Sequence, residues 1–274
     1  MSTIPVVVTA RNTSGLTTTA NAVINVADTA FVWPSPSNTG VPAGTVLTNY
    51  TGPTTISVPN TVIENKIFPS MITVITSGVT FRKCKFTAND VWLLNGDTAS
   101  NLLLEDCEFS NGVKAILGQG TFRRLYIHNC IIGITLKDGP STIDYCCIQD
   151  LDAHAQPDSP HFDAIFIGGG QRDCLIKDTL MNIPGDGGTS SILIASQWKG
   201  SNISNVTVNH CRMLGTPSYA MYAGSNTLGT CTGTVWTNNE VQRGAYGYWT
   251  IFGGSTVVRS GNKDAFTGAN IDNA

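Results

Sequence analysis

A six-residue phrase recurs through most of this chain: an apolar residue, two variable residues, a Cys or small polar residue, a variable residue and a second apolar residue. Its clearest copies are Phe81–Phe86, Leu104–Phe109, Ile127–Ile132 and Ile143–Ile148, with weaker copies at Val62–Ile67, Ile176–Met181, Val208–Met213 and Trp236–Val241 and a degenerate one at Gly261. Successive centres lie 16 to 33 residues apart, which is too loose for a rigid motif and typical of a coil with turns of variable length. The chain is therefore predicted to be a repeat protein whose coils bury their inward residues by stacking.

The stretches from about residue 41 onward support a β structure for these coils. Short runs of Val, Ile, Leu and Thr alternate with turns rich in Gly, Asn, Asp and Ser. No long stretch shows the apolar period of a helix. We therefore expect an all-β solenoid with strands in every coil.

Composition narrows the classes of partner. Charged residues make up only 13% of the chain, and the net charge is −3. A nucleic acid or an anionic membrane surface as partner calls for a basic face, so neither is expected. The N-terminal sequence lacks the basic and apolar regions of a secretory signal, and no apolar run approaches the length of a membrane helix. The expectation is a protein made in a cytoplasm and not inserted in a membrane, unless a signal was removed.

The eight cysteines are expected to be core residues. Five of them, at positions 84, 107, 130, 146 and 211, occupy the same place in the phrase, which favours small buried side chains stacked coil upon coil. Adjacent coils lie close enough for a disulfide between neighbours, so pairing stays open. No CxxC pair is present, and a zinc site is not expected.

Four segments are predicted along the chain. Residues 1–30 carry two alternating runs around a turn and predict a β-hairpin used for attachment or packing, because a lone hairpin is marginally stable. Residues 31–60 are expected to form a Pro-rich linker and N-terminal cap, 61–265 the solenoid, and 266–274 a C-terminal tail. The longest intervals, on both sides of Thr179, predict loops that project from the coil, where function is commonly found.

The Cys-rich phrases, the Val62-Ile-Glu-Asn-Lys stretch and the opening Asn38-Thr-Gly-Val-Pro-Ala-Gly resemble the right-handed parallel β-helix proteins of the pectate-lyase-like superfamily, over about residues 35–265. Within this superfamily the chain resembles members from actinobacteria and their phages, which carry a similar Asn-Thr-Gly-Val-Pro-Ala-Gly opening. The resemblance implies a right-handed parallel β-helix. It leaves activity open, because the superfamily includes polysaccharide lyases, hydrolases, epimerases and phage fibres without activity.

The densest group of polar residues lies in the long interval after Cys146. It contains the candidate catalytic residues Asp152, His154, His161 and Asp163. His161-Phe-Asp163-Ala-Ile165 resembles the His-x-Asp-Gly-Ile phrase of such helices, with Ala164 in place of Gly. Two residues apart on a strand, His161 and Asp163 face the same side, and a carboxylate beside an imidazole favours a general acid or base near neutral pH.

Several alternatives for this group remain open. Two carboxyl groups about 5 to 9.5 Å apart would suit glycan hydrolysis. Asp150, Asp152 and Asp158 also fit solvated turns, and clustered carboxylates suit calcium, although no EF-hand spacing is present. The Asp-rich calcium ligands and neighbouring Arg of the well-known lyases do not match cleanly. No metal or cofactor is assigned.

A second set of residues predicts a binding groove. Cationic groups pair with uronate carboxylates and aromatic faces stack on sugar rings, provided that they share one face of the coil. The set consists of Arg172, Lys177, Asp186, Trp198, Tyr219 and Tyr222. Each aromatic residue also fits ordinary packing.

Three hypotheses for function follow. The first is a virion-associated tail or fibre protein that binds, and in one version cleaves, a host cell-surface polysaccharide. The second is a free, extracellular polysaccharide lyase or glycoside hydrolase. The third is a structural spike or decoration protein without activity. A homotrimer or contacts with other virion proteins would favour the first and third.

Overall fold

The computed structural model describes residues 2–11, 13–15, 17–26, 30–89, 92–152, 161–185, 187–196 and 201–274. The chain divides into two compact units, Met1–Val32 and Trp33–Ala274. The first unit is a hairpin of β1 (Ser2–Arg11) and β2 (Thr17–Val26), paired antiparallel from Ser2 opposite Val26 to Arg11 opposite Thr17. The predicted hairpin is confirmed.

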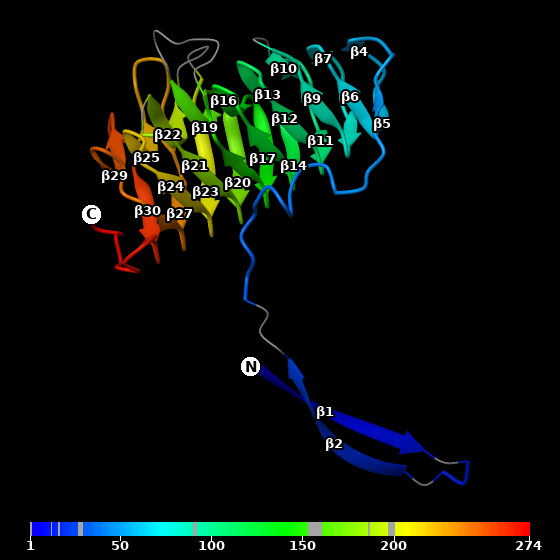
Figure 1. The fold of residues 1–274 in the computed structure, drawn as a ribbon. Helices are drawn as coiled ribbons and strands as arrows, with labels where there is room; N and C mark the ends of the chain where they lie inside the picture. The colour runs from blue at the N-terminus through cyan, green and yellow to red at the C-terminus, as the bar shows by residue number, and fades with distance from the viewer. Residues whose placement is uncertain are drawn as a thin grey trace. The chain divides into compact units, whose positions relative to one another are not determined.

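The second unit winds through three parallel sheets, and successive coils stack along one axis (Figure 1). Sheet 1 contains β4 (Thr55–Ile56), β7 (Ile72–Val74), β10 (Trp92–Asn95), β13 (Lys114–Gly118), β16 (Ile132–Leu136), β19 (Phe162–Ile167), β22 (Gly188–Ala195), β25 (Tyr219–Gly224) and β29 (Gly247–Phe252). Sheet 2 contains β5 (Val62–Glu64), β8 (Thr80–Arg82), β11 (Leu102–Glu105), β14 (Gly120–Arg123), β17 (Gly139–Asp144), β20 (Gln171–Lys177), β23 (Ile203–Asn209), β27 (Thr234–Thr237) and β30 (Val257–Ser260), and β26 (Cys231–Thr232) also pairs with β23. Sheet 3 contains β3 (Thr48–Asn49), β6 (Lys66–Phe68), β9 (Lys85–Thr87), β12 (Glu108–Ser110), β15 (Tyr126–His128), β18 (Cys147–Gln149), β21 (Leu180–Ile183), β24 (Arg212–Gly215), β28 (Glu240–Val241) and β31 (Lys263–Asp264).

This architecture is a right-handed parallel β-helix, as predicted. The described residues contain no helix, so none of them forms a helix able to cross a membrane. The sheets begin within the segment expected to be linker and cap, because β3 and β4 pair with β6 and β7 of the next coil.

The repeated phrase is the corner between sheets 2 and 3. Its third residue is left-handed, as at Lys83, Asp106 and Tyr145, with φ of 50°, 55° and 53°. One left-handed residue turns the chain sharply, and the next residue then points into the core. This geometry explains why the fourth position of the phrase is small or polar.

In three copies of the phrase, the predicted central residue does not lie directly after the left-handed residue of the corner between sheets 2 and 3. Cys130 follows β15 and lies at the corner between sheets 3 and 1, and Leu125, between β14 and β15, occupies the expected place. The first copy is shifted by one residue, because Ile67 pairs with Lys85 and Lys66 therefore aligns with Cys84. The last copy centres on Asn262, since Gly261 is its left-handed residue.

Aromatic rings stack along the axis of the core. Phe68, Phe86 and Phe109 lie on successive coils with ring centroids 4.5 Å apart. The column continues through aliphatic residues in register, namely Ile127, Ile148, Met181, Met213 and Val241. Their burial supplies the main stabilisation of a coil that has no core of its own.

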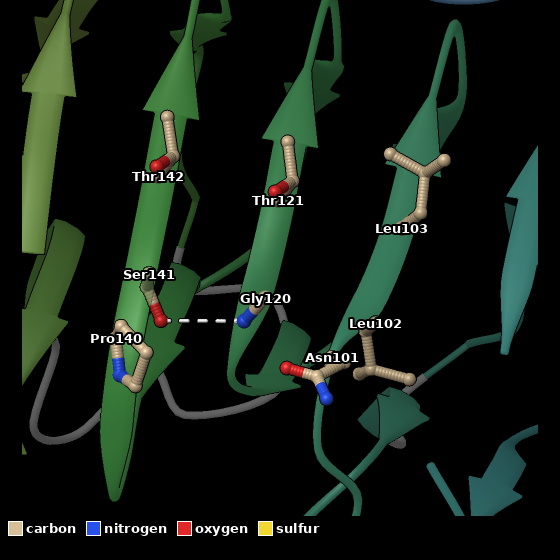
Figure 2. A pocket seen from close by; sticks show the side chains of 8 residues that line it. All are labelled: Asn101, Leu102, Leu103, Gly120, Thr121, Pro140, Ser141 and Thr142. Carbon is tan, nitrogen blue, oxygen red and sulfur yellow. Dashed lines mark hydrogen bonds between the residues drawn. The ribbon is translucent and has the colours of Figure 1, made fainter. Parts of the chain in front are cut away.

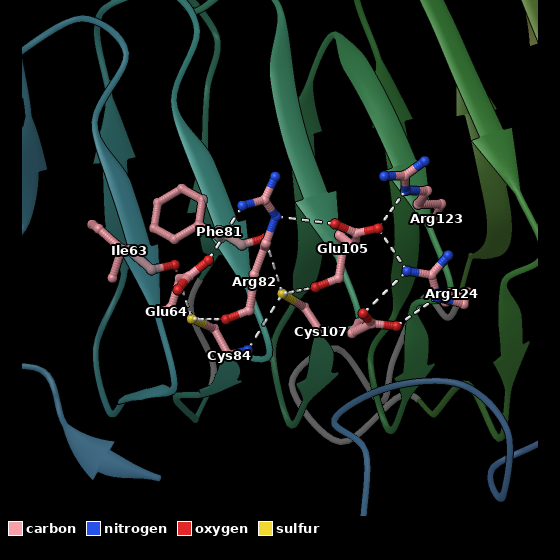
Figure 3. Close-up of polar contacts among 10 residues, drawn as sticks. Ile63, Glu64, Phe81, Arg82, Cys84, Glu105, Cys107, Arg123 and Arg124 are labelled. Atoms are coloured by element: carbon pink, nitrogen blue, oxygen red, sulfur yellow. Dashed lines mark hydrogen bonds and ion pairs between the residues drawn. The ribbon is translucent and has the colours of Figure 1, made fainter. Parts of the chain in front are cut away.

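All eight cysteines are buried and free, which confirms their expected place in the core. They also form hydrogen bonds, as Figure 3 shows for Cys84 and Cys107. The Cys84 N–H donates to Cys107 Sγ at 3.5 Å, and the Cys107 thiol donates to the Glu105 carbonyl at 3.2 Å. The fourth position of the phrase therefore provides an acceptor for the N–H of the preceding coil.

A row of ion pairs follows the outer face of sheet 2 beside this corner (Figure 3). Its residues are in register and alternate in sign: Glu64, Arg82, Glu105, Arg123, Asp144 and Lys177. Glu105 accepts from Arg82 at 3.0 Å and lies 2.7 Å from Arg123. Neighbouring coils are thereby linked by opposite charges.

The C-terminal tail covers the last coil. Asp272 accepts hydrogen bonds from the backbone N–H groups of Gly261 and Asn262, at 2.8 and 3.0 Å. Ile271 is buried, and Trp249 Nε1 donates to the Ala274 carbonyl at 2.8 Å. These contacts give the last coil the hydrogen-bond and packing partners that a further coil would otherwise supply, which the terminal coil of a solenoid requires.

Candidate functional site

Chemically active side chains gather along one row across sheet 1. Residues paired across adjacent strands are Trp92 with Lys114, Lys114 with Ile132, Ile132 with Asp163, and Asp163 with Ser190. Tyr219 continues the row. Ile192 pairs with Met221, so Ser190 and Tyr219, each two residues earlier on the same strands, also lie opposite each other. Neighbouring strands lie about 4.8 Å apart, so the row extends across several coils.

Asp163 is the centre of this row. Its Oδ1 accepts a hydrogen bond from Ser190 Oγ at 2.5 Å, and its Oδ2 lies 3.0 Å from His161 Nδ1. The Asp163 side chain is only 2% exposed, whereas that of His161 is 57% exposed. The carboxylate is therefore held inside, and the imidazole is the group available to a ligand.

The environment of His161 sets its proton chemistry. The hydrogen bond with Asp163 raises the pKa of His161, and this effect exceeds the opposing effect of burial. A carboxylate bonded to Nδ1 favours the tautomer with its proton on Nδ1, which leaves Nε2 as the basic atom. His161 is thus an oriented base when neutral and a proton donor when charged.

The loop that precedes His161 leaves and rejoins the coil at almost the same place. The Asp152 N–H donates to the Cys130 carbonyl at 3.0 Å, and Asp163 pairs with Ile132, only two residues beyond Cys130. Two residues of strand span about 6.6 Å, so Asp152 and Asp163 flank the base of this loop. Asp152 itself is exposed.

A cation lies two strands away from Asp163 on the same row. Lys114 Nζ lies over the Trp92 ring, 4.6 Å from its centroid. Burial lowers the pKa of Lys114, while the charge of Asp163 partly opposes that effect. An ammonium group on an aromatic face is positioned for an anion with little loss of side-chain entropy.

Tyrosines lie at the other end of the row. Tyr219 and Tyr222 are perpendicular with centroids 5.3 Å apart, and the exposed Tyr246 lies 5.9 Å from Tyr219. Burial raises the pKa of Tyr222, with further effects of Tyr219 and Asp163. Tyr222 also packs on a small apolar cluster of Phe166, Leu193 and Ala195.

The structure separates the residues predicted from sequence. His161 and Asp163 form the predicted pair, and Tyr219 and Tyr222 lie on the same sheet. Arg172 and Lys177 do not share this face, because β20 belongs to sheet 2, where Lys177 pairs with Asp144 at 2.9 Å. The expected single groove therefore does not include them. His154, Asp186 and Trp198 lie outside the described residues, as does Asp158.

Ser190, Lys114 and Trp92 were missed by the sequence reading. Each is an ordinary surface or strand residue in sequence, and only the register across coils places it on the same row as Asp163. Among the described residues, no group of three or more His, Cys, Asp or Glu side chains is placed to hold a metal ion.

A hollow of about 310 Å³ lies on the outer face of sheet 2 (Figure 2). Its lining consists of Asn101, Leu102, Leu103, Gly120, Thr121, Pro140, Ser141 and Thr142. None of these side chains carries a charge or titrates near neutral pH, and one hydrogen bond in the hollow joins the Gly120 N–H to Ser141 Oγ at 3.3 Å. The row on sheet 1 is the better candidate for chemistry.

Comparisons with known proteins give limited information. No protein-family model matches the chain, and no curated protein matches it. Among solved structures, the chain is similar to endopolygalacturonase I from Stereum purpureum in complex with two galacturonates, with a TM-score of 0.39 and 14% identity over 76% of this chain and 84% of that chain. A likeness at this level carries no argument about activity, and the fold assignment rests on the three parallel sheets themselves.

Proposed function

We propose that the outer face of sheet 1 binds a polysaccharide and that His161 transfers a proton during its cleavage. The observation that carries the proposal is the contrast between the enclosed Asp163 carboxylate and the exposed imidazole bonded to it. Both oxygens of Asp163 are engaged, so Asp163 acts as a positioning residue. The group that meets substrate is His161.

This arrangement favours β-elimination on a uronic acid residue. Neutral His161 removes the proton from C5 through Nε2, the electrons form the C4=C5 double bond, and the C4–O bond breaks. The proton on Nε2 then passes to the leaving glycosidic oxygen, which regenerates the base. No oxidant, reductant or water is consumed in this sequence.

Two neighbours on sheet 1 support an acidic sugar as substrate. Lys114 supplies a positive charge for the carboxylate of the uronic acid residue. This positive charge stabilises the negative charge that develops at C5 during proton removal. Tyr219 and Tyr246 supply ring faces further along the row, where successive sugars would lie.

Hydrolysis is the second candidate, and the base of the long loop favours it. Asp152 and Asp163 flank that base at a backbone separation compatible with paired carboxyl groups. In this alternative Asp152 takes the exposed catalytic position, and the products contain no double bond.

The biological setting proposed is a virion component that engages a host cell-surface polysaccharide, as a homotrimer or with other virion proteins. The separate hairpin of residues 2–26 supports this setting, since a two-stranded ribbon gains stability when it packs on a partner. A free extracellular enzyme and a spike without activity are the alternatives.

The test is a panel of acidic and neutral polysaccharides assayed for two products, namely unsaturated uronate by its ultraviolet absorbance and new reducing ends. We expect both from an acidic polymer with the wild-type chain and neither with His161→Gln. His128→Gln is the matched control, because His128 also bonds a carboxylate, Glu108 at 3.2 Å, but lies on sheet 3. It should retain full activity.

Three results would contradict parts of the proposal. Reducing ends without unsaturated products would assign hydrolysis. Full activity in His161→Gln would remove His161 from the reaction. Binding without cleavage of any polymer in the panel would leave a binding protein and refute the enzymatic role.

A further inference from the structure

A residue of the next coil holds Asp163 in place. Ser190 Oγ donates to Asp163 Oδ1 at 2.5 Å, while Asp163 Oδ2 lies 3.0 Å from His161 Nδ1. Ser190 is buried as completely as Asp163. Its hydroxyl therefore supports the site from behind and does not itself meet a ligand.

A bulge in β22 brings Ser190 opposite Asp163. Phe162 pairs with Gly188. The next residue of β19, Asp163, pairs with Ser190, so β22 contains one extra residue, Thr189. Regular pairing would place Thr189 opposite Asp163 and turn Ser190 to the other face of the sheet. Bulges next to functional sites commonly redirect a side chain in this way.

Close packing fixes the start of the bulge. A Cβ atom at Gly188 would collide with the Pro184 carbonyl oxygen, so this approach of two backbone segments requires glycine. On the other side, the Gly188 carbonyl accepts from the Ser218 N–H at 2.9 Å. The position of Ser190 is thus set by contacts with the preceding loop and with the following coil.

The bond from Ser190 acts on both the orientation and the charge of Asp163. The terminal torsion of an Asp side chain is broad, so its two oxygens exchange places unless one of them is fixed. With Oδ1 bonded to Ser190, Oδ2 stays on His161. A hydroxyl donor also stabilises the charged form of a buried carboxylate. That carboxylate is the main cause of the raised pKa of His161.

We propose that Ser190 is a positioning residue that sets, through Asp163, the pH range in which His161 acts as a base. The inference rests on the proposed role of His161 and adds the group that regulates it. The other titratable groups on or beside this face are Lys114 of β13, Tyr219 and Tyr222 of β25, and Asp152 at the base of the long loop. Replacement of Ser190 leaves all of them in the chain.

Ser190→Ala should move the titration of His161 to higher pH. Without the hydroxyl, the Asp163 carboxylate depends more on the positive imidazolium for its stabilisation. The pair therefore retains its proton to higher pH, whichever of the two groups carries it. This shift is opposite in sign to the one expected for Asp163→Asn, which removes the charge. Ser190→Cys, with a similar volume and a weaker donor, should shift the titration in the same direction as Ser190→Ala.

Ser191 provides the matched control on the same strand. It is buried like Ser190, but its hydroxyl has no hydrogen-bond partner in the part of the chain that the structure describes. It follows the pair of Asp163 and Ser190 directly and lies opposite the core residue Ala164. Ser191→Ala should leave the titration of His161 unchanged.

An NMR titration of the imidazoles in the full chain measures these shifts without substrate. The spectrum of His161→Gln identifies the signal, and circular dichroism checks the fold of each variant. The double variant with Ser190→Ala and Asp163→Asn should titrate like Asp163→Asn alone, because Ser190 acts through the carboxylate. On an acidic polymer, Ser190→Ala should lower kcat about 10-fold with little change in KM, since orientation and not binding is lost.

A titration of His161 in Ser190→Ala that equals that of the wild-type protein, or that moves to lower pH, would overturn the proposal. So would an equal shift in Ser191→Ala, or a further shift when Ser190→Ala is added to Asp163→Asn. Because the titration needs no substrate, it tests the role of Ser190 separately from the proposed cleavage. Failure of the proposed function is recognised instead by the absence of cleavage by the wild-type chain.

Discussion

At the scale of single residues, the function proposed here depends on how Asp163 and His161 divide their roles. A buried carboxylate without partners would be costly, but Asp163 is stabilised by Ser190 Oγ and His161 Nδ1. Because the carboxylate keeps a fixed position, it fixes the ring of His161 and the tautomer that the ring adopts. The exposed Nε2 then acts at a defined place on the row.

The first prediction concerns Asp163→Asn. Without the carboxylate charge, the pKa of His161 should fall toward its ordinary value, since the bond with Asp163 is the main cause of the raised pKa. The acidic limb of the rate profile, which reports formation of neutral His161, should therefore move to lower pH. The maximum rate should fall about 10²-fold or more, because an amide no longer selects the correct tautomer. Steady-state rates across pH measure both effects.

An NMR titration of the imidazole checks the same prediction without substrate. His161 should titrate at lower pH in Asp163→Asn than in the wild-type protein, because the hydrogen bond with Asp163 is the main cause of its raised pKa. An unchanged His161 titration would show that Asp163 does not control its pKa.

At the scale of the element, each coil is stabilised by the residue that follows the left-handed corner. Thr179 Oγ1 accepts from the Cys146 N–H at 3.3 Å, and Asn239 Oδ1 accepts from the Cys211 N–H at 2.9 Å. Cys, Thr and Asn are thus alternative solutions to one problem, namely a buried N–H that the ladder does not satisfy. Cys107 and Thr179 also donate, each through its single hydrogen, whereas the Asn239 amide donates to two acceptors, the Val208 carbonyl at 3.1 Å and Asn262 Oδ1 at 2.8 Å.

The second prediction follows from that difference. Asn239→Ala removes the acceptor for Cys211 and the donor to the Val208 carbonyl at 3.1 Å. The free energy of unfolding should fall by about 2–4 kcal/mol, because buried polar groups lose their partners. Asn182→Ala, at an exposed position of sheet 3, should change it by less than about 0.5 kcal/mol. Urea unfolding of both variants measures the difference.

The third prediction concerns the ion-pair row on sheet 2. Burial alone would raise the pKa of Glu105, but bonds from Arg123, Arg124 and Arg82 outweigh it and lower the pKa. A lowered folded-state pKa gives stability that is present above the unfolded pKa and is lost as pH falls through the folded value. Glu105→Gln should therefore lower the urea midpoint at neutral pH, and the difference from wild type should shrink in acid. A constant difference at every pH would contradict this.

The sequence was sufficient for the fold and only partly for the site. Cys phrases predicted stacked coils and buried thiols because one corner geometry recurs in every coil. The predicted position of Cys130 within its coil was wrong. Leu125 occupies the corner between sheets 2 and 3, and a second left-handed residue, Asn129, places Cys130 at the next corner. His161 and Asp163 were predictable as neighbours on one strand. Lys114 and Ser190 were not, because their proximity depends on the length of each intervening coil.

At the scale of the whole molecule, the β-helix is a stack in which each coil is stabilised by its neighbours. Interior coils are supported on both sides, while the last coil depends on the tail for the partners that a further coil would supply. Asp272 accepts from Asn262 Nδ2 at 2.7 Å in addition to the two backbone N–H groups. One carboxylate thus takes the place of several ladder contacts.

The last prediction is that Asp272→Ala destabilises the end of the stack and leaves its middle intact. Loss of these hydrogen bonds should weaken the last coil by about 2 kcal/mol, which corresponds to amide exchange about 30-fold faster in β30 and β31. Because stability in a solenoid passes between nearest neighbours, exchange in β11 and β12 should stay at the wild-type rate. Hydrogen exchange followed by mass spectrometry resolves the two regions. Uniform acceleration along the chain would instead show that the coils unfold as one cooperative unit and that Asp272 contributes to global stability.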